Sequence, residues 1–155
     1  ILRACVKKHK LNGRDGIGVV VPHRAQRAYL QERFPELARA DAIDTVERFQ
    51  GGERDVIVVS ATASDPDYVL AEADFLLNLN RLNVALSRPR KKLIVVASQS
   101  VTRLLVSDLD VFENSMIWKR LYYSYANEPL FRGSVKGVPV WGRGHRANGS
   151  KSLLA

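Results

Sequence analysis

The sequence is poor in the residues that make covalent or metal cross-links. Among its 155 residues it has one cysteine, Cys5, and three scattered histidines, His9, His23 and His145. A single cysteine cannot form an internal disulfide and is typical of a reducing compartment. The histidines have no cysteine or carboxylate neighbours at the spacing of a zinc site. We therefore expect no disulfide and no metal held by this chain alone.

Long apolar runs are also missing. No run approaches the ~20 residues that a membrane-spanning helix needs, and the N-terminal stretch ILRACVKKHK turns basic too soon for a signal peptide. The chain begins at Ile1, and its only methionine is Met116. We expect no membrane partner, an intracellular, cytoplasmic location (nuclear in a eukaryote), and a chain that is a piece of a longer protein.

Acidic residues are outnumbered by basic ones. The 24 Lys and Arg residues exceed the 16 Asp and Glu residues, which gives a net charge of +8 at pH 7 and a pI near 9.9. Such an excess favours a polyanionic partner such as nucleic acid or nucleotide phosphates. A basic surface that is only solvated is the alternative.

Short apolar runs predict the strands of one sheet. They cover residues 17–21, 55–61 and 92–98, with a weaker run at 42–46. Runs rich in Val and Ile without polar alternation are typical of strands covered on both faces. Helical patterns lie at 24–34 and 80–88, and two more helices are expected after residue 98. This alternation predicts an α/β fold with an open, mostly parallel sheet and helices on both faces.

The C-terminal stretch has a different composition. Residues 131–155 contain five glycines, five Lys or Arg residues and no acid. We expect one domain over residues 1–130, followed by a flexible or loosely docked basic tail over residues 131–155. The tail either adds phosphate contacts or is merely solvated.

Motifs for autonomous ATP chemistry are missing. A P-loop needs the pattern G-x-x-x-x-G-K-[ST] between a strand and a helix. The nearest match, GHRANGSK at 144–151, has Ser150 where the lysine should follow and no predicted strand before it. No acidic residues follow the three strong strands directly to hold magnesium. The chain has no recognisable means of binding and cleaving ATP by itself.

Two polar segments nevertheless suit phosphate and sugar groups. Arg88 precedes Pro89, and a residue before proline is disfavoured in helical geometry, so the helix should end there. That leaves the guanidinium at a corner between a helix and a strand, where it can bind phosphate or simply be solvated. Gly51 and Gly52 allow close backbone approach to a ligand, and Glu53 beside them can accept hydrogen bonds from a sugar hydroxyl. The alternative is an ordinary glycine turn.

Three segments together resemble a known family. IGVVVPHRAQ, IDTVERFQGGERDVIVVS and RLNVALSRPRKKLIVVAS resemble motifs IV, V and VI of superfamily 1 helicases. The similarity is strongest to the branch that includes the nonsense-mediated-decay helicase, and it covers residues 17–105 approximately, in the expected order. It implies the second, C-terminal RecA-like motor domain, a P-loop NTPase-like fold that lacks the P-loop itself. ATP would lie between this domain and an N-terminal motor domain of the same chain, which would hold most of the Mg²⁺ ligands.

The resemblance implies roles in the nucleotide cleft. Arg88 would be the arginine finger that reaches the γ-phosphate, and Glu53 would contact the ribose. Gln50 and Gly51 would couple the nucleotide cleft to the nucleic-acid groove. Gly52 also belongs to this set of nucleotide-site residues, although it replaces a frequent arginine and so removes a possible phosphate contact.

It also implies a surface for single-stranded DNA or RNA. Pro22, His23 and Thr45 would lie along the strand and contact its phosphates more than its bases. His23 replaces the usual tyrosine but keeps a ring that can stack. Arg81 and Asn83 would make structural or coupling contacts.

Two alternatives stay open from the sequence. The domain could be an ATPase-inactive module that binds nucleic acid or a partner, or a basic scaffold with a helicase-like fold. Under the favoured hypothesis, the isolated 155 residues should bind single strands weakly and in a salt-sensitive way, and should not hydrolyse ATP.

Overall fold

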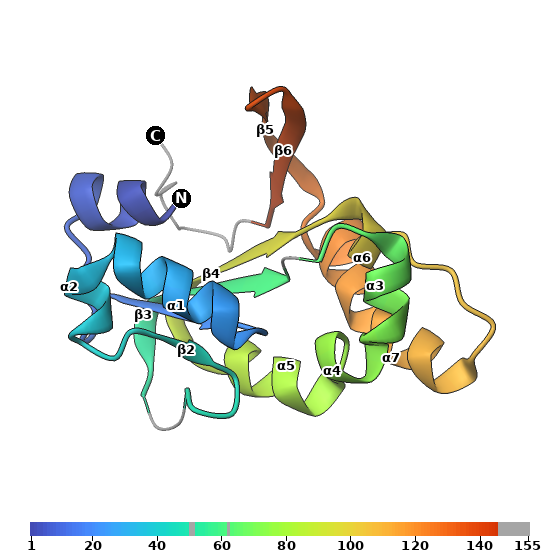
Figure 1. Cartoon of the computed structure of the whole chain (residues 1–155). Helices are drawn as coiled ribbons and strands as arrows, with labels where there is room; N and C mark the ends of the chain where they lie inside the picture. The colour runs from blue at the N-terminus through green and yellow to red at the C-terminus, as the bar shows by residue number, and fades with distance from the viewer. Residues whose placement is uncertain (50–51, 62, 146–155) are drawn as a thin grey trace.

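The chain forms a four-stranded sheet flanked by helices and, near its C-terminal end, a separate hairpin (Figure 1). The computed structural model describes residues 1–49, 52–61 and 63–145. The strands are β1 (Ile17–Val21), β2 (Ile43–Thr45), β3 (Arg54–Ala61), β4 (Pro89–Ala97), β5 (Glu128–Val135) and β6 (Val138–Gly144). The helices are η1 (Ala4–Lys8), α1 (Arg24–Arg33), α2 (Pro35–Ala38), α3 (Pro66–Ala71), α4 (Ala73–Leu76), α5 (Leu79–Leu86), α6 (Gln99–Thr102), α7 (Leu109–Lys119) and η2 (Arg120–Tyr125). In the part of the chain that the structure describes, no helix is both long and apolar enough to span a bilayer.

The main sheet is parallel throughout, with the strand order β2-β1-β3-β4. One row across it joins Ile43, Val19, Val58 and Ile94. Parallel neighbours require long connections, which here run through helices and one extended loop. The α/β fold with a mostly parallel RecA-like sheet is therefore confirmed.

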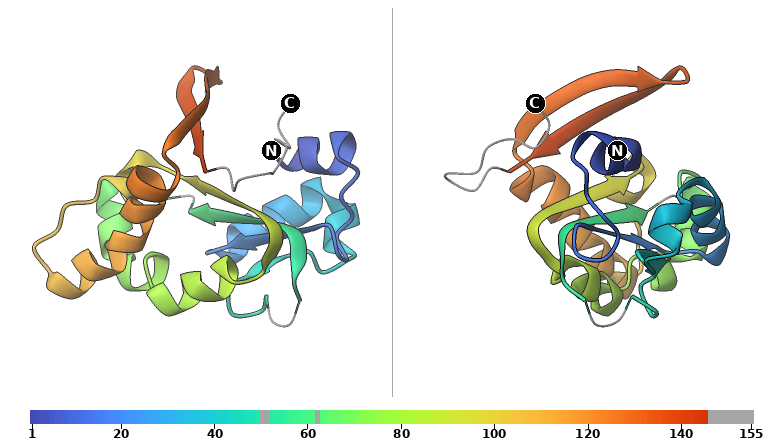
Figure 2. Two further views of the ribbon diagram at one scale, coloured as in Figure 1. Left: turned by 180° about the vertical axis from the view of Figure 1, so that it is seen from behind. Right: turned by 90° about the vertical axis from the view of Figure 1, so that its left-hand side faces the viewer.

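Two apolar cores lie on opposite faces of the sheet, because successive strand residues point to opposite sides. On one face Val20 and Val59 belong to a buried cluster that includes Trp118 of α7. On the other face Val19 and Val58 belong to a cluster with residues of η1 and α2. Figure 2 shows helices on both sides of the sheet. The continuous apolar runs of β1 and β3 are explained by this double coverage.

The structure corrects the prediction for β4. The strand was expected over residues 92–98 and covered on both faces, but it begins at Pro89 and ends at Ala97. It lies at the edge of the sheet, and Val96 is 39% exposed. An edge strand has one neighbour only, which leaves part of its apolar surface uncovered. Composition alone does not distinguish such a strand from a central one.

The C-terminal region contains a hairpin that the sequence did not predict. β5 and β6 pair antiparallel, with Val135 opposite Val138 across a two-residue turn. In that turn Lys136 and Gly137 have φ values of 50° and 79°, as a type I′ turn requires. The predicted division between residues 130 and 131 falls inside β5. The hairpin stands away from the body of the domain (Figures 1 and 2).

Gly18, the second residue of β1, makes room for the loop between β2 and β3. A Cβ atom on Gly18 would lie 2.4 Å from Cζ of Phe49 and 2.9 Å from Cδ1 of Ile57. Phe49 is 7% exposed and belongs to the same core cluster as Ile57. The missing side chain of Gly18 therefore lets Phe49 anchor the loop against the sheet.

We expect Gly18→Ala to lower the free energy of unfolding by about 1–3 kcal/mol, the usual cost of overpacking a core. Gly133→Ala in β5 is the matched control, because nothing lies within 4 Å of a Cβ atom there. Urea unfolding followed by circular dichroism measures both variants. Equal midpoints for Gly18→Ala and the unmodified protein would contradict the packing described here.

Candidate functional site

The predicted site residues form two groups at the two ends of the parallel strands. We call these ends of the sheet its carboxyl edge and its amino edge. Pro22 and His23 follow β1, and Thr45 ends β2, so these three lie at the carboxyl edge. Glu53 precedes β3 and Arg88 precedes β4, so these two lie at the amino edge. These five predicted site residues therefore do not share one edge.

Arg88 occupies the corner expected from the proline that follows it. Helix α5 ends at Leu86, and β4 begins at Pro89. The carbonyl of Arg88 accepts a hydrogen bond of 3.2 Å from the backbone N–H of Arg54. This bond places Arg88 beside the residue that follows Glu53. Arg88 and Glu53 therefore lie just before two neighbouring strands, β4 and β3.

The side chain of Arg88 is not neutralised by its surroundings. Its Nε atom is buried and has no hydrogen-bond partner among the described residues. No ion pair to Arg88 is formed within residues 1–49, 52–61 and 63–145. A buried, charged donor without a partner is costly unless a ligand supplies the acceptor. This orphaned donor fits an anionic group such as a phosphate.

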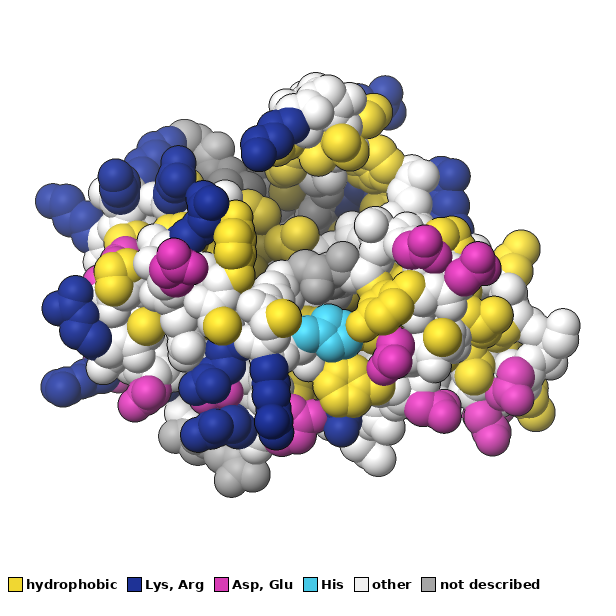
Figure 3. Space-filling view, viewed as in Figure 1, with side chains coloured by type: hydrophobic (Ala, Val, Ile, Leu, Met, Phe, Trp, Pro, Cys, Tyr) yellow, Lys and Arg dark blue, Asp and Glu magenta, His cyan; other side chains and the backbone are white. Residues whose placement is uncertain are grey.

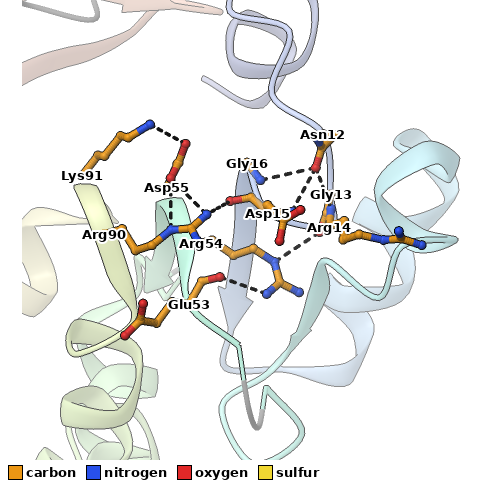
Figure 4. Close-up of polar contacts among 10 residues, drawn as sticks. All are labelled: Asn12, Gly13, Arg14, Asp15, Gly16, Glu53, Arg54, Asp55, Arg90 and Lys91. Atoms are coloured by element: carbon orange, nitrogen blue, oxygen red, sulfur yellow. Dashed lines mark hydrogen bonds and ion pairs between the residues drawn. The ribbon is translucent and has the colours of Figure 1, made fainter.

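The two cations that follow Arg88 are, in contrast, bound to one carboxylate (Figure 4). Nε of Arg90 and Nζ of Lys91 donate to the two Asp55 oxygens at 3.1 Å and 2.7 Å. Arg90 also donates from Nη2 to the carbonyl of Asp15 at 3.0 Å. The start of β4 is thereby fixed to β3 and to the residues before β1.

The ammonium of Lys91, hydrogen-bonded to Asp55, lowers the pKa of that carboxyl below its usual value of 3.8, and the charge of Arg90 adds to the effect. A pKa that is lower in the folded state stabilises the fold above pH 3.8, and this contribution is lost as the pH falls through the folded-state value. Asp55 is therefore a structural carboxylate that holds the amino edge together.

Asp55→Asn is expected to lower the urea midpoint at neutral pH by a small amount, because it removes both charge-assisted contacts. The midpoints of the variant and the unmodified protein should converge as the pH falls below the Asp55 pKa. Unfolding curves at several pH values measure this. A difference that persists unchanged in acid would exclude the ion pairs as its cause.

Glu53 stays available to a ligand. Its side chain is exposed, while its backbone carbonyl accepts a hydrogen bond of 3.2 Å from Nη1 of Arg54. Arg54 also donates from Nε to the carbonyl of Gly13 at 3.2 Å, which fixes the chain before β1. In Figure 4 the Glu53 carboxylate points away from the Arg54 guanidinium. Gln50 and Gly51, predicted beside it, lie outside the described residues.

At the carboxyl edge, His23 lies in an aromatic cluster. Its ring stacks on Phe75 of α4, with centroids 5.6 Å apart and planes at 14°. Its Nε2 is 3.2 Å from the hydroxyl oxygen of Tyr68 on α3. His23 is half-buried and Tyr68 is 43% exposed, so part of the cluster faces solvent.

Arg81 connects this cluster to the loop after β2. Its guanidinium carbon lies 4.1 Å from the centroid of the Phe75 ring, and Nη1 contacts Oε1 of Glu47 at 2.8 Å. Phe75 therefore contacts both His23 and Arg81. Neither Phe75 nor Glu47 was predicted as a site residue, because Phe75 lies between the recognisable motifs and Glu47 occupies a variable motif position.

Two connections run between the two edges of the sheet. The loop 46–53 begins near Glu47 at the carboxyl edge and ends at Glu53, and α5 begins near Arg81 and leads to Arg88. The Arg81–Glu47 ion pair joins them at one end, and the Arg54–Arg88 backbone bond joins them at the other. The two connections are thus linked to each other at both edges.

Thr45, predicted to contact the strand, is largely buried at the end of β2. Its side chain is 7% exposed, and its carbonyl accepts hydrogen bonds from Arg48 and Phe49 at 3.1 Å and 2.8 Å. These two hydrogen bonds hold the start of the loop that follows β2. Pro22 is half-buried at the surface, and Asn83 on α5 is exposed.

Charge is unevenly distributed over the face that carries both connections (Figure 3). Lys and Arg side chains gather on the side of α1 and α2, while Asp and Glu side chains gather over α3, α4 and α7 (Figures 1 and 3). A polyanion is attracted to the first side and repelled from the second.

Comparison with known proteins identifies the family. A family model described as an AAA domain matches residues 1–100. The chain belongs to the AAA domain family. The match includes β1 to β4 and therefore both Glu53 and Arg88. It ends before α7 and the hairpin. Within this family the chain is a superfamily 1 helicase domain, as the three motifs indicated.

Several relatives of this AAA domain are named as helicases. The chain is 41% identical over 106 residues to the DNA polymerase alpha-associated DNA helicase A of Saccharomyces cerevisiae, covering 63% of this chain and 15% of that protein. It is 36% identical over 130 residues to the regulator of nonsense transcripts 1 of Dictyostelium discoideum, covering 79% and 9%. It is 40% identical over 81 residues to the DNA replication ATP-dependent helicase/nuclease DNA2 of Xenopus tropicalis, covering 52% and 8%. The chain therefore spans only a small part of these proteins.

The donor set of the AAA domain fits a nucleotide better than a metal. The guanidinium of Arg88, whose buried Nε has no partner among the described residues, and the exposed carboxylate of Glu53 suit phosphate and sugar groups, respectively. No three His, Cys, Asp or Glu side chains of the described ranges lie close enough together to hold a metal ion.

Proposed function

We propose that this chain is the C-terminal motor domain of an ATP-dependent DNA or RNA helicase or translocase. It would supply an arginine finger to ATP and part of the groove for a single strand. The observation that carries the proposal is the placement, at one edge of the sheet, of the exposed Glu53 near Arg88, whose buried Nε atom has no hydrogen-bond partner among the described residues. The helicase names of several relatives support the same conclusion.

In this mechanism the amino edge faces ATP held by the N-terminal motor domain. ATP supplies the γ-phosphoryl group that is transferred to water, with Mg²⁺ held mainly by that other domain. Arg88 would place its guanidinium against the γ-phosphate oxygens and neutralise the charge that develops there. Glu53 would accept a hydrogen bond from the ribose, and Gly51 and Gly52 would allow close backbone approach to the nucleotide. Gln50 and Gly51 would couple the nucleotide cleft to the nucleic-acid groove.

The carboxyl edge would contact the single strand. Pro22 and His23 lie at the surface there, with His23 held by Phe75 and Tyr68. A ring supported in this way can stack on a base or lie against the sugar, which is how sequence-independent strand contacts are made. Thr45 would support this surface from below.

Coupling between the edges would follow the loop 46–53 and α5. Closure on ATP would move the Glu53 and Arg88 corners, and the Arg81–Glu47 pair would transmit that shift to His23 through Phe75. Such a device changes the populations of an open and a closed state in response to the nucleotide.

An ATPase-inactive binding or scaffold module is the second candidate function. It accounts for the basic surface, but it gives no reason for a buried guanidinium donor without a partner. A protein that contains both motor domains distinguishes the two, because only the helicase proposal predicts ATP hydrolysis that rises on addition of single-stranded nucleic acid.

We expect His23→Ala to reduce the stimulation of ATP hydrolysis by single strands in that protein, with basal turnover nearly unchanged. Loss of one stacking partner costs about 1–3 kcal/mol in binding, so the half-maximal strand concentration should rise by about fivefold or more. His9→Ala, at the end of η1, is the matched control. Equal effects of the two substitutions would show that His23 does not contact the nucleic-acid strand.

A further inference from the structure

We propose that the β5–β6 hairpin, together with η2, forms a second contact surface for single-stranded nucleic acid. This surface lies beyond residue 100, where the family match ends, and is separate from the carboxyl edge of the sheet. The proposal rests on the proposed function only for the class of ligand. The composition of the hairpin, the exposure of its side chains and the face on which each of them lies support the proposal.

One face of the hairpin combines cations with an aromatic ring. Arg132 of β5 lies directly opposite Trp141 of β6, so their side chains share a face. Arg143 is two residues from Trp141 on the same strand and therefore points the same way. Trp141 is 37% exposed, and both arginines are exposed. We call Arg132, Trp141 and Arg143 the basic-aromatic face.

Contacts with η2 hold this face in place. The indole Nε1 of Trp141 donates to the hydroxyl oxygen of Tyr122 at 2.5 Å. The guanidinium carbon of Arg143 lies 5.3 Å from the centroid of the Tyr122 ring. Nε of Arg143 donates to the carbonyl of Ala126 at 2.7 Å. A preorganised ring and cation lose little freedom when a strand binds.

More rings and cations surround the face. Tyr123 and Tyr125 of η2 are 52% and 61% exposed. Between residues 120 and 145 the sequence has one acid, Glu128, against four Lys or Arg residues. Arginines interleaved with exposed rings suit a flexible polyanion whose bases can stack, and single-stranded nucleic acid is that polyanion.

The opposite face of the hairpin is apolar and supplies the competing hypothesis. Phe131, Val135 and Val138 are 50%, 59% and 62% exposed, and the ring of Phe131 lies over Gly142. A protein partner would bury this apolar face, whereas a nucleic-acid strand would contact the basic-aromatic face. Substitutions on the two faces therefore separate the two occupants.

The experiment uses the 155-residue chain and an oligothymidylate at low salt. Trp118 is 4% exposed and Trp141 is 37% exposed, so quenching of tryptophan fluorescence by the oligonucleotide reports mainly Trp141. We expect quenching by the single strand, less by a duplex whose bases are already stacked, and none in Trp141→Phe. Anisotropy of a dye-labelled oligothymidylate should show Trp141→Ala binding roughly fivefold to a hundredfold more weakly.

Charge on the same face gives an independent measure. Arg132→Glu should weaken binding and lower the salt dependence by about one counterion. Val135→Ser on the apolar face is the matched control and should leave binding unchanged. Binding that is insensitive to Trp141→Ala and Arg132→Glu, but is lost in Val135→Ser, would overturn the proposal in favour of a surface that uses the apolar face.

Two outcomes separate this proposal from the function proposed above. If His23→Ala weakens binding but the hairpin substitutions do not, the hairpin proposal is wrong and the motor assignment stands. If the unmodified chain shows no quenching of Trp141 at low salt, the hairpin proposal is also wrong, while the Arg88 and ATP turnover tests remain independent of it.

Discussion

Replacing Arg88 with alanine in a protein that contains both motor domains should lower ATP turnover at least tenfold, with the fold intact. Arginine fingers contribute factors of about 10³–10⁵ in comparable phosphoryl transfers, because they neutralise charge that develops on the γ-phosphate oxygens. The measurement is steady-state ATP hydrolysis at saturating single-stranded nucleic acid. Truncation removes no hydrogen bond of the Nε atom to a described residue.

Two further variants make the Arg88 result specific. Arg103→Ala removes another arginine at an exposed position just after α6 and should leave turnover unchanged. Arg88→Lys keeps the charge but loses the planar fork, and should therefore retain only part of the activity. An inactive binding module or scaffold predicts no change in any of the three. Thermal unfolding of each variant separates loss of activity from loss of structure.

The isolated 155-residue chain should show no ATP turnover, whereas the protein with both motor domains should turn ATP over. The sequence has no P-loop between a strand and a helix, and a finger accelerates hydrolysis only when another surface holds and aligns the triphosphate. A phosphate-release assay on the purified chain, with and without single-stranded nucleic acid, measures this.

The control for the isolated chain is its own Arg88→Ala variant. Turnover that is equal in both preparations indicates a contaminating ATPase and agrees with the account. Turnover that is robust in the unmodified chain and lost in the variant would contradict it, because the chain would then hold and hydrolyse ATP alone.

The central strands could be predicted from sequence because burial on both faces imposes a continuous apolar run. β1 and β3 are covered by both cores, and their predicted limits agree with the structure to within one residue. β4 has the same composition but lies at the edge, and pairing extends its start back to Pro89. Edge position depends on the strand order, which residue types do not encode.

The hairpin could not be predicted from composition. The glycines of the C-terminal region were interpreted as a sign of flexibility, yet a Cβ atom on Gly142 would lie 2.1 Å from Cε1 of Phe131, and one on Gly144 would lie 2.7 Å from Cδ1 of Leu130. These glycines make space for neighbouring side chains across the ribbon. The Lys136–Gly137 turn lacks the Asn-Gly or Asp-Gly pair that signals a hairpin most strongly.

The candidate site was predictable where it depends on neighbours in sequence. The position of Arg88 at a helix–strand corner follows from Pro89, whereas its placement near Glu53 depends on the pairing of β3 with β4 in the structure. The contacts of Phe75 with His23 and Arg81 join three separate segments. Only tertiary structure brings such segments together, so no local pattern marks them.

The most direct test of the account is the position of Arg88 in a crystal structure of the protein with both motor domains, bound to a γ-phosphate mimic and single-stranded nucleic acid. We expect the Arg88 guanidinium to donate hydrogen bonds of about 2.7–2.9 Å to the mimic, with the Glu53 carboxylate near the ribose. An Arg88 side chain turned away from the nucleotide in that closed state would contradict the account.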